Sequence, residues 1–186
     1  VNQPLPKGDN IAIITNAGGP GIMATDACVR YGLKIPILSE KTRGILKTGL
    51  PITANINNPV DVIGDAKEDR YTLALKAVLD DPDINGVIVI CTPQMMTNLK
   101  SMANTIVALY KEKTKPIISC FMATSDIAET LNILEAGGVP HYRFPESCAR
   151  ALAYMWKYSR WIHRPRTEIR KFTDISLNST KVNMYL

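Results

Sequence analysis

One run of six residues, Gly86–Cys91, constrains the fold of this chain more than any other feature of its sequence. The four residues Val87–Ile90 inside the run are all apolar and β-branched, with no polar residue between them. A continuous apolar run of this length is typical of a strand whose two faces are both covered, as in a parallel sheet. We therefore predict that this run is a central strand of an α/β domain.

Similar apolar runs alternate along the chain with segments in which apolar residues recur at helical spacing. The predicted strands are Ile11–Thr15, Leu33–Leu38, Gly86–Cys91, Pro116–Cys120 and Val139–Tyr142. The predicted helices are Pro20–Gly32, Ser39–Leu46, Lys67–Asp80, Asn98–Tyr110, Ser125–Ala136 and Pro145–Trp161. Strands that alternate with helices imply right-handed βαβ units. The sequence thus predicts a flavodoxin-like, doubly wound five-stranded parallel sheet in the order 2-1-3-4-5, with helices on both faces.

Charge and composition divide the chain into three parts. Residues 1–9 are polar and Pro-rich and are predicted to be a linker that leads into the domain of residues 10–162. Residues 163–186 are predicted to be a basic linker or a tail that docks on a partner. Residues 157–186 hold seven Lys or Arg and two acidic residues, which is the whole net charge of +5. Because this region has no Arg-rich block, we expect a solvated linker rather than a nucleic-acid-binding arm.

Four widely spaced cysteines and the absence of any long apolar segment indicate a reduced, cytoplasmic protein with no membrane span. The cysteines are Cys28, Cys91, Cys120 and Cys148, and no two of them form a CxxC motif. A buried thiol in an apolar run behaves as a small hydrophobic side chain, so we predict all four in or near the core. The N-terminal residues lack the apolar segment of a signal peptide.

The first predicted strand runs directly into a glycine-rich segment, Asn16–Gly21, which we name the glycine loop. Ligands of doubly wound sheets bind outside the carboxyl ends of the strands. Gly18 and Gly19 allow a tight turn and a close approach of an anion to the backbone N–H groups, while Pro20 suits a first helical turn. The free N–H groups and the helix dipole then face the anion. Close packing of a βα turn is the alternative explanation of these glycines.

Three further loops are predicted to lie at the same edge of the sheet. Asn58 and Asp61 follow the second βα unit and could contact a substrate, or form an Asx-turn with a structural cap. Thr92 and Pro93 follow the strongest strand and could line the site, or only lead into the next helix. The segment Phe121–Thr124 follows the fourth strand, and its last residue or Ser125 could instead cap a helix.

Other common catalytic patterns are missing from the sequence. His141 and His163 are the only histidines, and neither is spaced to pair with a base or an orienting carboxylate. No metal-ligand spacing and no Gly-x-Ser-x-Gly motif occur. We therefore expect both histidines to be structural and predict no catalytic residue and no metal site on this chain.

Five segments resemble one domain of the ADP-forming (NDP-forming) acetate/acyl-CoA synthetases. They are Lys7–Gly21 (KGDNIAIITNAGGPG), Asn58–Asp61 (NPVD), Asp81–Asp83, Tyr158–Trp161 and Arg164–Pro165. The resemblance covers residues 4–166, and the first motif is specific when it is taken together with the second. The domain is also similar to the C-terminal domain of the succinyl-CoA synthetase β subunit.

The resemblance implies an enzyme that interconverts acyl-CoA, phosphate and ADP with acid, CoA and ATP through a phosphohistidine. It implies a phosphate-binding role for the backbone N–H groups of Gly18, Gly19 and Gly21, with Asn16 and Ala17 shaping the approach. It also implies partners: a CoA-binding domain, a phosphohistidine domain, an ATP-grasp domain with Mg²⁺, and a small carboxylic acid as substrate. None of these cofactors is expected to bind to this chain alone.

The chain departs from the complete family pattern, because the CoA-binding, phosphohistidine and ATP-grasp domains are absent from it. We therefore expect it to be inactive alone. A non-catalytic module that senses acyl-CoA or a nucleotide, for example fused to a protein acetyltransferase, is the alternative. A flavin carrier is a third possibility that the fold allows, although the glycine loop lacks the hydroxyls and flanking aromatics of a flavin site.

Overall fold

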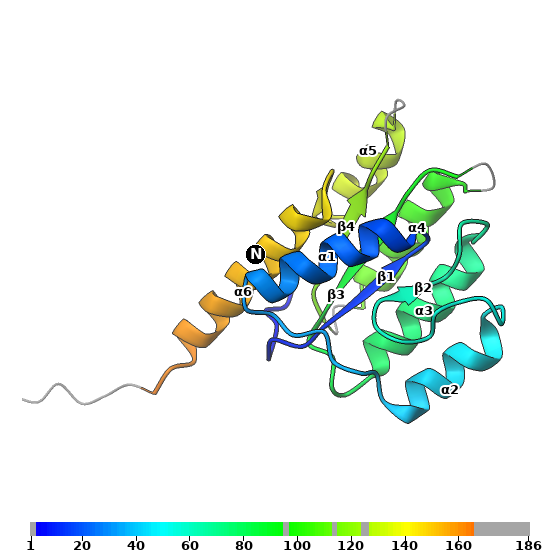
Figure 1. Cartoon of the computed structure of the whole chain (residues 1–186). Coiled ribbons are helices and arrows are strands. Elements are labelled where there is room, and N and C mark those ends of the chain that lie inside the picture. The colour runs from blue at the N-terminus through cyan, green and yellow to red at the C-terminus, as the bar shows by residue number, and fades with distance from the viewer. Residues whose placement is uncertain (1–2, 95–96, 113–114, 124–126, 166–186) are drawn as a thin grey trace, which may run out of the picture.

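The computed structural model describes residues 3–94, 97–112, 115–123 and 127–165 (Figure 1). Its strands are β1 (Ile11–Thr15), β2 (Val60–Asp61), β3 (Gly86–Cys91), β4 (Ile117–Phe121) and β5 (His141–Tyr142). Its helices are α1 (Gly18–Arg30), α2 (Glu40–Gly49), α3 (Glu68–Asp80), α4 (Leu99–Tyr110), α5 (Ala128–Ala136) and α6 (Pro145–Ile162). The strands form one parallel sheet in the order β2-β1-β3-β4-β5, which confirms the predicted fold class.

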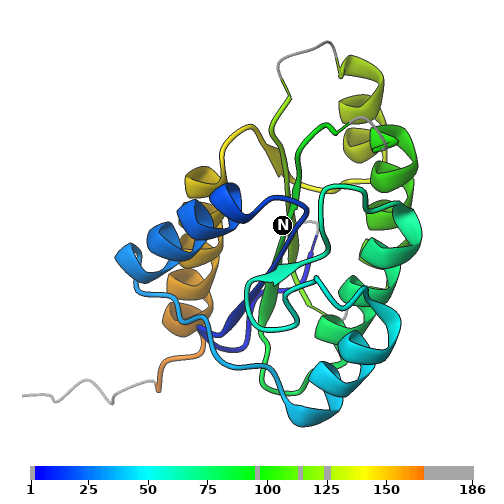
Figure 2. The ribbon, with the colours of Figure 1, turned by 45° about the vertical axis from the view of Figure 1, so that its right-hand side comes forward.

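Two layers of helices cover the two faces of the sheet (Figure 2). On one face, alternate residues of the central strands, such as Ile13 and Ile88, pack with α1 and α6. On the other face, the residues between them, such as Ile14 and Val89, pack with α3, α4 and α5. Each central strand is thus buried on both sides, which explains why its sequence is continuously apolar.

β1 and β3 are the two central strands, and they pair along their whole length from Ile11 opposite Gly86 to Thr15 opposite Ile90. The chain leaves β1 toward β2 on one side and leaves β3 toward β4 on the other. The carboxyl ends of β1 and β3 are therefore the topological switch point of the sheet, where doubly wound domains bind ligands.

Local signals in the sequence set several helix ends. Ser39 caps α2 by accepting a hydrogen bond from the Thr42 N–H, and Asn98 caps α4 in the same way. α1 ends with Gly32 at φ 82°, where the N–H of Leu33 donates to the Cys28 carbonyl in a Schellman arrangement. Glycine adopts this left-handed conformation without strain, so Gly32 is suited to this position just after the end of α1.

The predicted strand Leu33–Leu38 is wrong. Only Lys34 in this segment forms a bridge, to Asn10, and the second strand of the sheet is the two-residue β2. The edge of β1 is filled instead by the side-chain amide of Asn58, which accepts from the Ile13 N–H at 2.9 Å and donates to the Ile11 carbonyl at 2.8 Å. A side chain thus takes the place of a neighbouring strand, which hydrophobic periodicity does not reveal.

The predicted burial of the cysteines is confirmed. All four cysteines are buried and free, and burial raises the pKa of Cys28 and Cys91 to about 12, so these two thiols stay protonated. In the part of the chain that the structure describes, no helix is long and apolar enough to cross a membrane. The proposed caps at Thr124 and Ser125 and the tail of residues 166–186 lie outside the described residues.

Asp81 ties the start of α2 to the turn before β3. Its carboxylate accepts hydrogen bonds from the Ser39 N–H at 2.9 Å and the Asp83 N–H at 3.0 Å, and the residue is 1% exposed. Desolvation acts to raise the pKa of Asp81, but hydrogen bonds from Thr42 and the backbone outweigh it and hold that pKa below its ordinary value. The charged form is therefore the one that the fold stabilises.

Replacing Asn58 by alanine should destabilise the domain by about 2 kcal/mol, because backbone groups of β1 lose their hydrogen-bond partner. Urea unfolding would measure the loss. The matched control is Asn57→Ala, since the Asn57 side chain is exposed. Equal stability of the two variants would contradict the structural role of the Asn58 amide.

The hydrogen bonds of Asp81 should make the fold less stable in acid. Because the folded pKa lies below the unfolded value of about 3.9, the stabilisation is complete above that value and is lost as the pH falls through the folded pKa. The free energy of unfolding of Asp81→Asn should therefore depend less on pH between about 5 and 2 than that of the unchanged chain. Parallel pH profiles would rule this contribution out.

Candidate anion-binding site at the carboxyl edge

The glycine loop turns directly into α1, with Ala17 as an N-cap residue in extended conformation. The N–H groups of Gly18 and Gly19 donate to no acceptor in the described part of the chain. Pro20 has no N–H, and the Gly21 N–H already donates to the Ala17 carbonyl at 3.3 Å. The start of the helix therefore offers two adjacent free donors, from Gly18 and Gly19.

The three glycines differ in what surrounds them. A Cβ added to Gly19 would meet no atom within 4 Å, whereas one added to Gly21 would lie 3.1 Å from Cγ2 of Thr15 and 3.6 Å from Cβ of Pro59. Packing thus explains Gly21, because a side chain there would collide with the core. It does not explain Gly19, whose open surroundings leave its N–H accessible.

Asn16 joins the ends of β1 and β3. Its Oδ1 accepts hydrogen bonds from both the N–H and the hydroxyl of Thr92, each at 2.9 Å, and its Nδ2 donates to the Thr92 carbonyl at 2.9 Å. Asn16 is 2% exposed, so these bonds are shielded from water. The pair fixes the strand ends at the switch point and holds the glycine loop where α1 begins.

The loop after β2 borders the glycine loop. Oδ2 of Asp61 would lie 3.7 Å from a Cβ on Gly18, and Oδ1 of Asp61 accepts from the Ile63 N–H at 2.9 Å. Ile63 has φ 71°, a strained conformation for a β-branched residue. The Gln94 side chain, from the loop after β3, lies against Gly64. Three loops therefore meet around the start of α1.

Two opposing electrostatic effects act at the two free donors: the helix dipole attracts an anion, and the nearby Asp61 carboxylate repels it. The first turn of α1 contains no acidic residue, and the helix dipole places about half a positive charge there. The loop after β2 places the Asp61 carboxylate beside Gly18. Beneath the site, the buried Tyr71 hydroxyl donates to the Ile90 carbonyl at 2.8 Å, and burial raises the pKa of Tyr71, so the phenol stays neutral.

The structure brings most of the predicted site residues together. The glycine loop, Asp61 and Thr92 lie side by side at the carboxyl edge, and Pro93 follows Thr92 as an exposed residue. Asn58 lies apart from them, since its amide hydrogen-bonds beside the middle of β1. Sequence reasoning missed the positive φ of Ile63, because isoleucine carries no turn signal.

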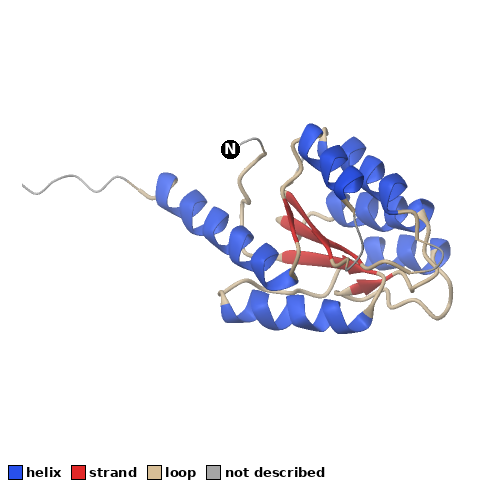
Figure 3. Ribbon diagram, turned by 90° about the horizontal axis from the view of Figure 1, so that it is seen from above, coloured by secondary structure: helices blue, strands red, loops and turns tan. Residues whose placement is uncertain are grey.

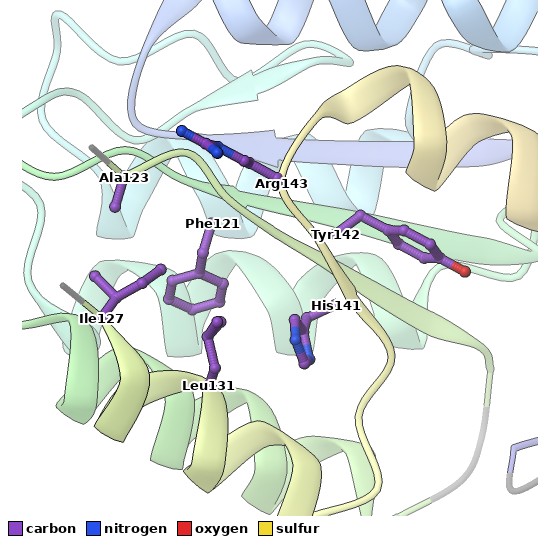
Figure 4. Close-up of a pocket in the computed structure, with 7 residues that line it drawn as sticks. All are labelled: Phe121, Ala123, Ile127, Leu131, His141, Tyr142 and Arg143. Atoms are coloured by element: carbon purple, nitrogen blue, oxygen red, sulfur yellow. The ribbon is translucent and has the colours of Figure 1, made fainter. Parts of the chain in front are cut away.

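A cavity of about 530 Å³ opens at the ends of β4 and β5 (Figure 4). It is lined by Phe121, Ala123, Ile127, Leu131, His141, Tyr142 and Arg143. In this view Phe121 and Leu131 face each other between β4 and α5, while Tyr142 points away and Arg143 lies on the other side of Phe121. The cavity therefore combines an apolar wall with a cation that has no ion-pair partner among the described residues.

The histidines are placed away from the free donors of α1. His141 lies 3.8 Å from the Glu135 carboxylate, and Nδ1 of His163 contacts the Ser159 carbonyl at 2.8 Å. Among the described residues, no group of three His, Cys, Asp or Glu side chains could hold a metal ion. At the carboxyl edge, the described residues thus offer the free backbone donors of Gly18 and Gly19.

Comparison with known proteins gives one family for this chain. Residues 11–166 match the Ligase-CoA domain family. The 4-hydroxybutyrate–CoA ligase (ADP-forming) of Nitrosopumilus maritimus is 34% identical over 97% of this chain and 26% of its own length. The acetate–CoA ligase (ADP-forming) of Methanocaldococcus jannaschii is 40% identical over 84% of this chain and 23% of its own length.

A solved structure agrees with these relatives. The dinucleotide-forming acetyl-coenzyme A synthetase 1 of Ca. Korarchaeum cryptofilum, in complex with phosphate and ADP, superimposes with a TM-score of 0.78 at 28% identity. The alignment covers 85% of this chain and 34% of that chain. This chain thus spans about a quarter to a third of the proteins that it matches.

The different surroundings of Gly19 and Gly21 predict opposite effects of alanine. Gly19→Ala should leave the free energy of unfolding unchanged or raise it by up to about 1 kcal/mol, since the added methyl group meets open space. Gly21→Ala should lower it by about 1–3 kcal/mol through overpacking. Thermal unfolding of the two variants measures the direction of each change in stability. A destabilised Gly19→Ala would show that packing restricts that position too.

Proposed function

Because the chain belongs to the Ligase-CoA domain family, we propose that it is the phosphate-gripping domain of an ADP-forming acyl-CoA synthetase. The complete enzyme would convert acid, CoA and ATP to acyl-CoA, ADP and phosphate. The ADP-forming ligases among the relatives support this reaction class. Their greater length supports a further role for domains outside this chain.

The observation that carries the proposal is the pair of free N–H groups of Gly18 and Gly19 at the open start of α1. A phosphoryl group bound there would receive two hydrogen bonds from donors that need no reorganisation. The helix dipole would stabilise its negative charge. The Gly21 N–H is already hydrogen-bonded to Ala17 within the helix, so it would not bind the phosphate. The role of Gly21 would instead come from its missing side chain, which lets α1 pack closely against Pro59.

Phosphoryl transfer depends mainly on positioning and on stabilisation of charge on the transferred group. The Asn16–Thr92 hydrogen bonds would hold the two donors in place, and Asp61 would border the bound group. The histidine that carries the phosphoryl group would belong to another domain. In this proposal Mg²⁺ would act with ATP on the ATP-grasp domain.

The partners of this domain would be the CoA-binding, phosphohistidine and ATP-grasp domains, together with a small carboxylic acid. Either separate subunits or one longer polypeptide would satisfy this arrangement. A cytoplasmic location fits the four reduced cysteines and the soluble substrates. The acid itself would be selected where this domain meets its partners.

The decisive variant is Gly19→Asp in the complete enzyme. An aspartate in the first turn favours a helix N-terminus, so the variant should fold, but its carboxylate would repel the phosphoryl group. We expect kcat/KM for acyl-CoA formation, measured by ADP release, to fall by about a hundredfold or more. The matched control is Gly44→Asp, since Gly44 is also an exposed helical glycine with open space around its Cα.

Full activity of Gly19→Asp would remove the proposed role of the glycine loop. A different result would favour the sensing module: the chain, combined with the missing domains, would bind acyl-CoA or nucleotide but form no acyl-CoA. The ratio of product to ADP in that reconstitution separates the two functions.

A further inference from the structure

The outer end of α6 forms a cavity far from the glycine loop. We call it the α6 cavity; it has a volume of about 610 Å³ and is lined by Lys7, Trp156, Ser159, Arg160, His163, Arg164 and Pro165. Figure 3 shows the last turns of α6 extending beyond the strands, at the end of the sheet opposite the start of α1. The cavity is therefore separate from the proposed phosphate site.

Two guanidinium groups at this end of α6 lie over indole rings at cation–π distances. The Arg160 guanidinium lies over the Trp156 ring, 6.0 Å from its centroid, and the Arg164 guanidinium lies over the Trp161 ring at 5.0 Å. A guanidinium over an aromatic face keeps the N–H groups at its edge free to donate. Both groups therefore keep N–H donors that an anion could accept from.

No negative charge compensates these cations within the described residues. The ion pairs found there involve neither Lys7, Arg160 nor Arg164. Glu146 is the only acidic residue of α6, and it lies in the first turn, at the opposite end of the helix. Lys7 comes from the N-terminal segment, so the fold gathers like charges from two distant parts of the chain.

The helix dipole explains only part of this charge. The C-terminal end of a helix carries about half a negative charge, which favours cations near it. The three permanent cations of Lys7, Arg160 and Arg164 exceed that charge several times. Within the residues that the structure describes, this excess positive charge has no carboxylate partner in an ion pair.

We propose that the α6 cavity binds a nucleotide or a similar organic polyphosphate. Two or more phosphate groups would accept from Arg160, Arg164 and Lys7, because arginine forks match phosphate oxygens. The volume is too large for a single phosphate but suits a drug-sized molecule. Trp156, which is half-buried, supplies an apolar wall for the organic part, and the Ser159 hydroxyl group lies at the same wall.

The chain contains two tryptophans, Trp156 and Trp161, and both lie at this end of α6. Intrinsic tryptophan fluorescence therefore reports on this region alone. Titration of the chain with ADP should change the fluorescence saturably, and isothermal titration calorimetry should give the same Kd. Adenosine, which lacks phosphate, should bind at least about tenfold more weakly, and added salt should weaken ADP binding.

The double variant Arg160→Gln/Arg164→Gln should bind ADP at least about thirtyfold more weakly in calorimetry, since two charge-assisted contacts are lost. The matched control is Arg150→Gln, an exposed arginine of the same helix that does not line the cavity. Calorimetry is needed for the double variant because its loss of the cation–π contacts also changes the fluorescence. Far-UV circular dichroism verifies that α6 is intact.

Three results would overturn the proposal. The first is the absence of saturable heat and fluorescence change with ADP. The second is equal loss of binding in Arg150→Gln and in the double variant, which would indicate a general charge effect. The third is binding of poly-glutamate but not of ADP or tripolyphosphate, which would mark the cavity as a docking surface for an acidic protein segment.

Discussion

The hydrogen bonds between Asn16 and Thr92 are the interaction on which the carboxyl edge of this domain depends. They join the end of β1 to the end of β3, where the chain turns to opposite sides of the sheet, and Asn16 itself is buried. The start of α1 follows Asn16 directly, so the position of its two free donors is set by this pair. Because these bonds fix the loop to a central strand, the two donors of the proposed phosphate site would need no reorganisation to bind an anion.

Most of the fold follows from the sequence because each central strand is buried on both faces. Val87–Ile90 reveal this burial by composition alone, and the helices reveal themselves by apolar spacing and by caps such as Ser39 and Gly32. The second strand was predicted wrongly because a side chain, Asn58, replaces backbone pairing along β1. The spacing of apolar residues shows which face of a strand is buried, but it does not show which groups hydrogen-bond to the edge of that strand.

The candidate site was predictable to a lesser degree. The glycine loop could be found from the sequence because glycine permits a tight βα turn and proline fixes φ at a value that suits the first turn of a helix. The different roles of its glycines could not be predicted from the sequence. Only the structure shows that a side chain at Gly21 would be crowded, whereas one at Gly19 would meet open space. The cations of the α6 cavity lie close in sequence except for Lys7, whose approach depends on the path of the N-terminal segment.

Phosphate binding by the N–H groups of Gly18 and Gly19 is tested most directly by titrating the ¹⁵N-labelled chain with inorganic phosphate and recording the amide chemical shifts. The account predicts that the amides of Gly18 and Gly19 shift most and saturate together, while Gly44 on α2 stays unchanged. Phosphate-dependent shifts confined to other amides, or no saturable shift at Gly18 and Gly19, would contradict it.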